Sequence, residues 1–265
     1  MNKHAATMVR NAELMGDDIV GIFLSEEVLG SSSKTKPMGD KLRRFIHHQE
    51  SIQCLRPLGS GIHGAVLLAT IKNVKYALKV FKYWKQPGPV FDSYEKAIYT
   101  SPLANESRAF ARLHAARKDG TWAVRCHGWM KLSDAQFRDI GDVFDGEGLS
   151  RWVIVKDYLP MLTDASHTNQ ILKNFAIPKE LRLLPHDVLP QNYRGSQIVD
   201  LSCTLTSPCP EWSEFEFNLF YSETVYGVLD WFEDPPKRSF LTSETFLSRT
   251  LAFLLRPFCA LGRSN

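Results

Sequence analysis

The sequence lacks the cysteine patterns of several specialised protein classes. Its five cysteines form no CxxC pair; they are Cys54, Cys126, Cys203, Cys209 and Cys259. This spacing excludes a zinc ribbon and argues against a secreted domain held together by disulfides. We therefore expect an intracellular protein, nuclear or cytoplasmic, in a reducing compartment.

Long apolar runs and an excess of one charge are also missing. The longest apolar runs, such as 20–24 and 251–255, are much shorter than the roughly 20 residues of a membrane-spanning helix. The first residues have no apolar signal-peptide core. The 32 basic and 29 acidic residues leave a net charge of +3, so nothing indicates a nucleic-acid or membrane partner.

What is present is a globular composition with a strand-rich first half. Hydrophobic residues make up 44% of the 265 residues and charged residues 23%, which suits a domain of one or two lobes. Apolar alternation predicts strands, with a turn at Lys72-Asn73, and helical spacing of apolar residues predicts one helix. The predicted strands are 51–61, 64–71, 74–84, 122–132 and 151–159, and the predicted helix is 105–117.

Between and around these segments the sequence is more polar. A short helix or strand is expected over 19–29, a linker over 30–37 and a loop over 134–148. After Leu159 prolines interrupt the chain repeatedly, and only 168–175 and 244–255 have the spacing of short helices. The second half is therefore predicted to be loop-rich.

A glycine-rich string lies between the first two strands. Gly59-Ser60-Gly61-Ile62-His63-Gly64-Ala65-Val66 has the pattern GxGxxGxV. Because a strand follows it and not a helix, the context is that of a kinase loop over nucleotide phosphates, where backbone N–H groups must approach oxygens closely. A glycine-rich hairpin turn is the alternative interpretation.

Charged residues follow in the order expected of a phosphate site. Tyr76-Ala77-Leu78-Lys79 matches the strand pattern whose lysine reaches the α- and β-phosphates, and Glu106 in the predicted helix would be its ion-pair partner. The alternatives are a solvated strand lysine and an ordinary surface glutamate.

Further along, Asp187 and Asn192 have the spacing Asp-x-x-Pro-x-Asn, and Asp200 follows in Val-Asp-Leu-Ser. As a catalytic loop, Asp187 would orient the attacking hydroxyl, while Asn192 and Asp200 would hold Mg²⁺. Asx turns beside prolines are the alternative interpretation.

Residues 59–200 resemble the eukaryotic protein-kinase superfamily. The strings GDKLRRF, LGSGIHGAV, YALKVF, ESRAFARL, NYRG and VDLS are similar, over about 38–210, to fungal kinase-like proteins related to the Fta-two subunit of the Sim-four kinetochore complex. The resemblance implies an α+β, kinase-like two-lobed fold, with an antiparallel sheet in the N-lobe and a shortened helical C-lobe. The implied division is a partly flexible extension over 1–38, an N-lobe over 39–160 and a reduced C-lobe over 161–265.

The resemblance also implies a nucleotide site. ATP and Mg²⁺ would be its ligands if the site is active, and the hinge at Lys156, Asp157, Tyr158 and Leu159 would offer backbone groups to adenine. Asp187, Lys79 and Glu106 would then be catalytic, and Asn192 and Asp200 would bind the metal. The implied nucleotide-binding residues are Gly59, Ser60, Gly61, Gly64, Val66, Ala77, Lys79, Asp157 and Leu159.

Departures from the kinase pattern keep three functions open. Where a kinase has the triplet His-Arg-Asp this chain has Pro185-His186-Asp187, so the arginine is absent. Leu189 replaces the phosphate-steadying lysine, and Ser202 replaces a glycine. An atypical phosphotransferase is expected if the remaining charged residues suffice. A pseudokinase scaffold with protein partners in a kinetochore-type complex and a small-molecule kinase are the alternatives.

Overall fold

The computed structural model describes residues 15–30, 41–84, 98–141, 143, 148–208, 213–229 and 231. The predicted helix 244–255 and nearly all of the predicted linker 30–37 lie outside these residues. The described part of the chain is α+β, with a large, mostly antiparallel sheet, which confirms the predicted class.

The sheet has seven strands in the order β1-β2-β6-β7-β5-β4-β3. The pairs β1–β2 and β2–β6 are parallel, and the other neighbours are antiparallel. The strands are β1 (Leu24–Val28), β2 (Leu42–Arg44), β3 (Gln53–Ser60), β4 (Gly64–Ile71), β5 (Val74–Lys82), β6 (Cys126–Lys131) and β7 (Leu149–Asp157). The predicted strands are confirmed, whereas β2 was not predicted.

The β4–β5 hairpin follows from its turn residues. Lys72 and Asn73 have φ of 51° and 63°, the left-handed conformation that a two-residue hairpin turn requires. The register then runs without a break from Ile71↔Val74 to Gly64↔Phe81. Local sequence is therefore enough to pair these two strands.

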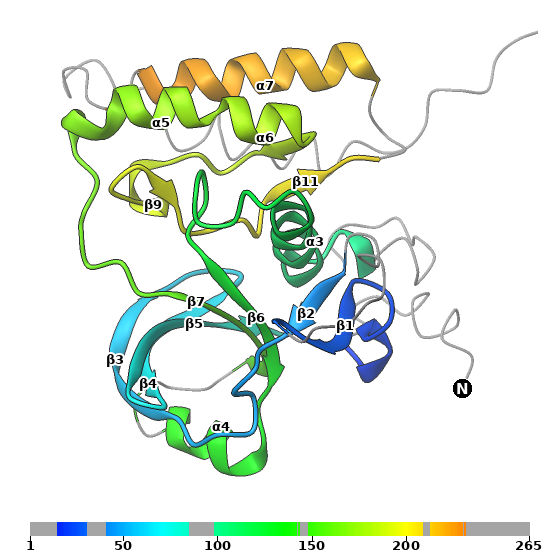
Figure 1. Cartoon of the computed structure of the whole chain (residues 1–265), viewed down its shortest axis with the longest axis vertical. Coiled ribbons are helices and arrows are strands. Elements are labelled where there is room, and N and C mark those ends of the chain that lie inside the picture. The colour runs from blue at the N-terminus through cyan, green and yellow to red at the C-terminus, as the bar shows by residue number, and fades with distance from the viewer. Residues whose placement is uncertain are drawn as a thin grey trace, which may run out of the picture.

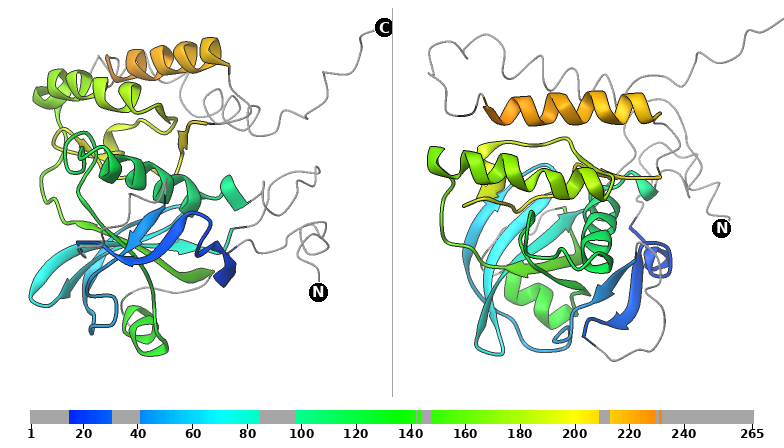
Figure 2. Two further views of the ribbon diagram at one scale, coloured as in Figure 1. Left: turned by 45° about the vertical axis from the view of Figure 1, so that its right-hand side comes forward. Right: turned by 45° about the horizontal axis from the view of Figure 1, so that its top comes forward.

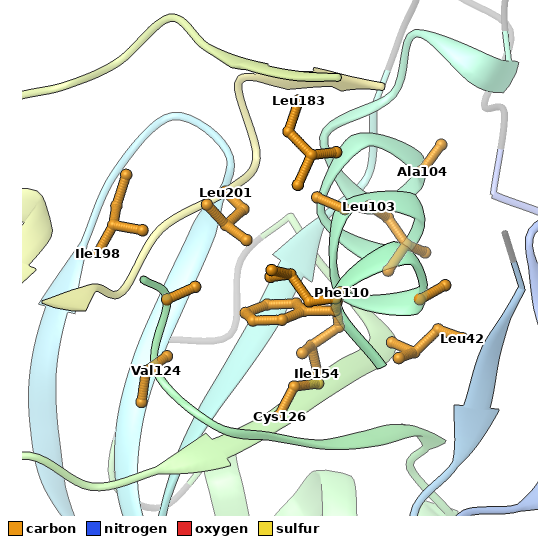
Figure 3. Packing of buried hydrophobic residues seen from close by; sticks show 14 of the residues in the cluster. Leu42, Leu103, Ala104, Phe110, Val124, Cys126, Ile154, Leu183, Ile198 and Leu201 are labelled. Carbon is orange, nitrogen blue, oxygen red and sulfur yellow. The ribbon is translucent and has the colours of Figure 1, made fainter. Parts of the chain in front are cut away.

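Helix α3 (Pro102–Ala115) begins earlier than the predicted residue 105 because of its cap. The Ser101 hydroxyl accepts a hydrogen bond from the Ala104 N–H at 3.1 Å, and Pro102 suits the first helical position. Phe110 points from α3 into the core beside Ile154 of the sheet, as Figure 3 shows.

The prediction of a loop over 134–148 is wrong for its first part, where α4 (Asp134–Gly141) forms. Ser133 and Gln136 make reciprocal hydrogen bonds of 2.9 and 3.3 Å between side chain and backbone, which is a capping box. Phe137 and Ile140 then pack under the sheet. The sequence carried this signal, but the Asp and Gly content of the segment concealed it.

The part of the chain after Leu159 has short elements and one long helix. The predicted helix at 168–175 is confirmed as α5, while the other elements were not predicted. The elements of this part are α5 (Thr168–Asn174), α6 (Ala176–Glu180), β8 (Leu183–Pro185), β9 (Tyr193–Arg194), β10 (Gln197–Ile198), β11 (Thr204–Thr206) and α7 (Glu214–Leu229), with 3-10 turns at Ala165–His167 and Pro190–Asn192. A further 3-10 turn, Asp17–Ile19, precedes β1.

Helix α3 lies between the sheet and the layer of α5, α6 and α7 (Figure 1). One apolar cluster fills the space between the sheet, α3 and these helices, and includes Trp129, Phe110 and Phe217. A second cluster covers the opposite face of the sheet, where α4 packs. Among the described residues, no helix is both long and apolar enough to cross a membrane.

Candidate functional site

The glycine-rich string forms the tip of the β3–β4 hairpin, as its strand context predicted. The Gly61 N–H donates to the Gly64 carbonyl at 2.9 Å. A Cβ at Gly64 would lie 2.2 Å from the Val80 carbonyl oxygen, so the strand contact itself requires glycine there. A Cβ at Gly59 or Gly61 would meet no atom within 4 Å, so packing does not explain glycine at these two positions.

Lys79 and Glu106 meet in the buried space between β5 and α3. The Lys79 Nζ lies 2.8 Å from Glu106 Oε2, and their side chains are 3% and 0% exposed. A buried pair of this kind is costly to desolvate and persists where both charges are fully compensated. The structure thus brings together the lysine and glutamate that the sequence paired.

A second lysine, Lys156, shares the same carboxylate. Its Nζ lies 2.7 Å from Glu106 Oε1 and donates to the Val199 carbonyl at 2.7 Å. Its side chain is 3% exposed. The hinge prediction concerns the backbone of Lys156 and stays a prediction; the ammonium group of this residue points to α3 and the segment before Asp200.

Asp200 completes this group of charges from its solvent side, since its own side chain is 30% exposed. Its Oδ1 accepts from Lys79 Nζ at 2.5 Å, from the Ser202 N–H at 2.9 Å and from the Ser202 hydroxyl at 2.7 Å. The two lysines and two carboxylates, Lys79, Lys156, Glu106 and Asp200, form what we call the charged tetrad, of which the first three are buried. Its formal charges cancel within the protein.

The ionisation of the tetrad follows from its pairing. Burial alone would lower the pKa of Lys79, but Asp200 and Glu106 outweigh it and hold that pKa above its usual value. Burial would likewise raise the pKa of Asp200, yet Lys79 and Lys156 keep it well below the usual range. Both groups are therefore charged at neutral pH.

Asp187 and Asn192 form a separate hydrogen-bonded pair in the turn after β8. The Asn192 Nδ2 donates to the Asp187 carbonyl and to its Oδ2, both at 2.9 Å. Burial raises the pKa of Asp187, and the hydrogen bond from Asn192 offsets part of that rise. This contact is not an Asx turn, in which a side-chain oxygen accepts from the N–H two residues on. Such a contact forms at Asp200, whose Oδ1 accepts from the Ser202 N–H.

The remaining predicted residues line the strands around the tetrad. Val66 pairs with Lys79 across β4 and β5, and Ala77 pairs with Lys156 across β5 and β7. Asp157 binds His127 Nε2 at 2.5 Å through its Oδ1, and its N–H donates to the Arg125 carbonyl. Leu159 packs against the main apolar cluster.

His63 joins the tip of the hairpin to the tetrad. Its Nδ1 lies 2.9 Å from the Ser202 hydroxyl, which in turn binds Asp200. Burial lowers the pKa of His63, and Lys79 lowers it further. The glycine-rich hairpin is therefore held close to Asp200 by side chains of this chain.

Sequence reasoning did not assign a site role to the Lys156 ammonium, His63 or Ser202. A signal for Lys156 existed, because in β7 it continues the alternating face of Trp152 and Ile154, which belong to the buried cluster. A lysine on a buried strand face needs a partner. No local pattern could have linked His63 with Ser202.

The residues present fit magnesium and nucleotide phosphates in chemical type. Asn192 and Asp200 supply amide and carboxylate oxygens, the ligands that Mg²⁺ takes in phosphate sites, and Lys79 supplies a cation. In this structure, however, Asp200 Oδ1 already accepts three hydrogen bonds. Binding through that oxygen would compete with these internal contacts.

Comparison with known proteins gives one family. The model described as "Kinetochore Sim4 complex subunit FTA2" matches residues 31–205, which include α3, the tetrad and the Asp187–Asn192 pair. No curated protein matches the chain.

Proposed function

We propose that this chain, which belongs to the family of the kinetochore Sim4 complex subunit FTA2, acts as a protein-binding subunit of a nuclear kinetochore complex on a protein-kinase-like scaffold. In this proposal residues 39–160 correspond to a kinase N-lobe and residues 161–265 to a reduced C-lobe, preceded by an extension over 1–38. Protein partners, and not a turned-over substrate, are its main ligands.

The mutual pairing of charges within the charged tetrad carries this proposal. Asp200, which would hold a metal in an active kinase, is neutralised by Lys79 and further bound by Ser202. Lys156 gives Glu106 a second cation at 2.7 Å. Because buried charges must be paired to persist, a tetrad that pairs its own charges keeps the fold intact without a bound nucleotide.

The experiment uses a variant that lacks the acid-base group a phosphotransferase would need but keeps the fold. Asp187→Asn takes away the acid-base group but keeps its volume, and Asp187 is not part of the tetrad. A fluorescently tagged Asp187→Asn chain is expected to localise to centromeres and to copurify with kinetochore proteins as well as the wild type does. The scaffold proposal would be rejected if the variant lost centromere localisation or copurification although its cellular level was normal. It would also be rejected if the wild-type chain never reached centromeres.

A second candidate is an ATP- and Mg²⁺-dependent phosphotransferase. The Lys79–Glu106 pair at 2.8 Å favours it, as does the open space beside Gly59 and Gly61. Lys79, positioned by Glu106, would bind the phosphates, and Asp187 would accept the proton of the attacking hydroxyl. Mg²⁺ held by Asn192 and Asp200 would neutralise charge on the transferred phosphate.

Calorimetric titration with ATP, with and without magnesium, tests this second candidate. Magnesium-dependent binding that disappears in Asp200→Ala would support it, whereas binding by neither protein would reject it. Glu26→Ala is the matched control, because this glutamate forms an exposed pair with Arg44 and lies outside the tetrad.

A further inference from the structure

Helix α7 is apolar on two opposite faces. Phe217, Tyr221 and Val228 are buried at 1%, 5% and 0% exposure. Phe215, Leu219 and Tyr226 have the same spacing two positions earlier and are 73%, 44% and 67% exposed. Since two residues turn a helix by about 200°, these three side chains form an outer stripe on the face opposite the core.

The position of α7 in the fold does not account for the apolar side chains of the outer stripe. Figure 2 shows α7 as the outermost helix, with α5 and α6 on its inner side. A helix that is apolar on all sides is normally covered on all sides, and a large exposed apolar patch marks a contact surface.

We propose that the outer stripe of α7 is the docking face for the chain's own segment 244–255. In the sequence of this segment Leu247, Leu251 and Leu254 recur at the spacing of one apolar helix face. It is joined to α7 in the same chain by residues 230–243, so its effective concentration at the stripe is far higher than that of a separate molecule.

The connection is long enough for the segment to return along the helix. The 16 residues of α7 span about 24 Å at 1.5 Å per residue. The stretch between Trp231 and Glu244, if extended, reaches about 40 Å. The segment can therefore lie along the full length of the stripe.

Charge favours this occupant over a second copy of the chain. Helix α7 carries Glu214, Glu216 and Glu223 and no lysine or arginine. The segment 244–255 is neutral, with Glu244 and Arg249 as its charged side chains, and residues 256–265 add Arg256 and Arg263 and no acid. Two α7 helices in a symmetric dimer would instead bring acidic faces together.

Photo-crosslinking in the full chain tests the proposal. With p-benzoylphenylalanine at Tyr226, we expect an adduct within the monomer to a peptide containing Leu247–Leu255. Leu251→Asp should reduce its yield at least tenfold, whereas Ser248→Asp, between the apolar positions, should leave it unchanged. The same probe at Val74, an exposed turn of the sheet, is the background control.

Three outcomes would overturn the proposal. An adduct between two chains would assign the stripe to a second copy, and an adduct to another protein alone would assign it to a partner. A Tyr226 signal no stronger than that of Val74 would show that the segment does not dock. The crosslinking measurement depends on neither nucleotide binding nor centromere binding, so its failure would not count against the proposed function.

Discussion

The sheet and the helices after Leu159 bury their residues in different ways. Strand β4 has apolar side chains on both faces, and β5 places Leu78 and Val80 in one cluster and Phe81 in the other. In contrast, α5, α6 and α7 cover only one side of the main cluster, and α7 exposes its outer stripe.

Because of this difference, charged side chains need partners of opposite charge in the first region and not in the second. Lys79 and Lys156 lie on the sheet face toward α3, and Glu106 lies on α3. All three side chains are at most 3% exposed, so each must have a partner of opposite charge. The charged groups of α7 face solvent, as in the exposed pair of Arg182 and Glu214. Four measurements would break or sharpen this contrast.

The largest effect is expected for Glu106→Gln, which leaves Lys79 and Lys156 buried without their shared carboxylate. Breaking a buried pair from one side costs about 3–5 kcal/mol, so urea unfolding should show a loss of at least this size. Glu26→Gln removes an exposed partner of Arg44 and should cost no more than about 1 kcal/mol. Equal losses of stability in the two variants would show that Glu106 and its two lysines are not as buried as their exposures of 0% and 3% indicate.

Next come two phenylalanines in the same apolar cluster, Phe81 in the sheet and Phe217 in α7, each 1% exposed. Replacing either by alanine should cost about 3–5 kcal/mol. Because one cluster joins the two regions, both variants should unfold in one transition, with coincident curves from tryptophan fluorescence and circular dichroism. A separate early transition in Phe217→Ala alone would mean that the two regions fold independently.

The pH dependence of the tetrad gives a smaller effect. The folded pKa of Asp200 is held below its ordinary value, so its contribution to stability is complete above the unfolded pKa of about 3.9 and is lost as the pH falls through the folded value. The stability difference between wild type and Asp200→Asn should therefore shrink below about pH 4. Asp134→Asn, which affects an exposed pair with Arg151, should show little such change in denaturant unfolding at the same pH values.

The smallest effect is expected at the start of α3. Ser101→Ala removes the side-chain acceptor of the Ala104 N–H and should cost about 1 kcal/mol in thermal unfolding. Ser101→Thr keeps the hydroxyl and should cost less. If the two variants were equally destabilised, the loss would come from packing around this buried side chain and not from the cap.

Elements built from neighbouring residues could be predicted. The hairpin at Lys72-Asn73 depends on the left-handed conformation of these two residues, and the glycine-rich tip is closed by the hydrogen bond from Gly61 to Gly64. Helix α4 was missed although its capping box and its apolar pair Phe137 and Ile140 were visible. Helix α7 was missed because apolar residues on both faces give it no amphipathic periodicity.

The order of the charged motifs, from Lys79 through Glu106 to Asp200, was readable along the chain and led to the pairs that form. That these side chains contact one another could not be read from the sequence, because contacts between distant residues depend on how the sheet, α3 and the segment after β10 pack. Lys156 lies 50 residues from Glu106, and His63 lies 139 residues from Ser202. Periodicity records which face of a strand is buried, whereas the partner of a buried charge is chosen only when separate elements meet.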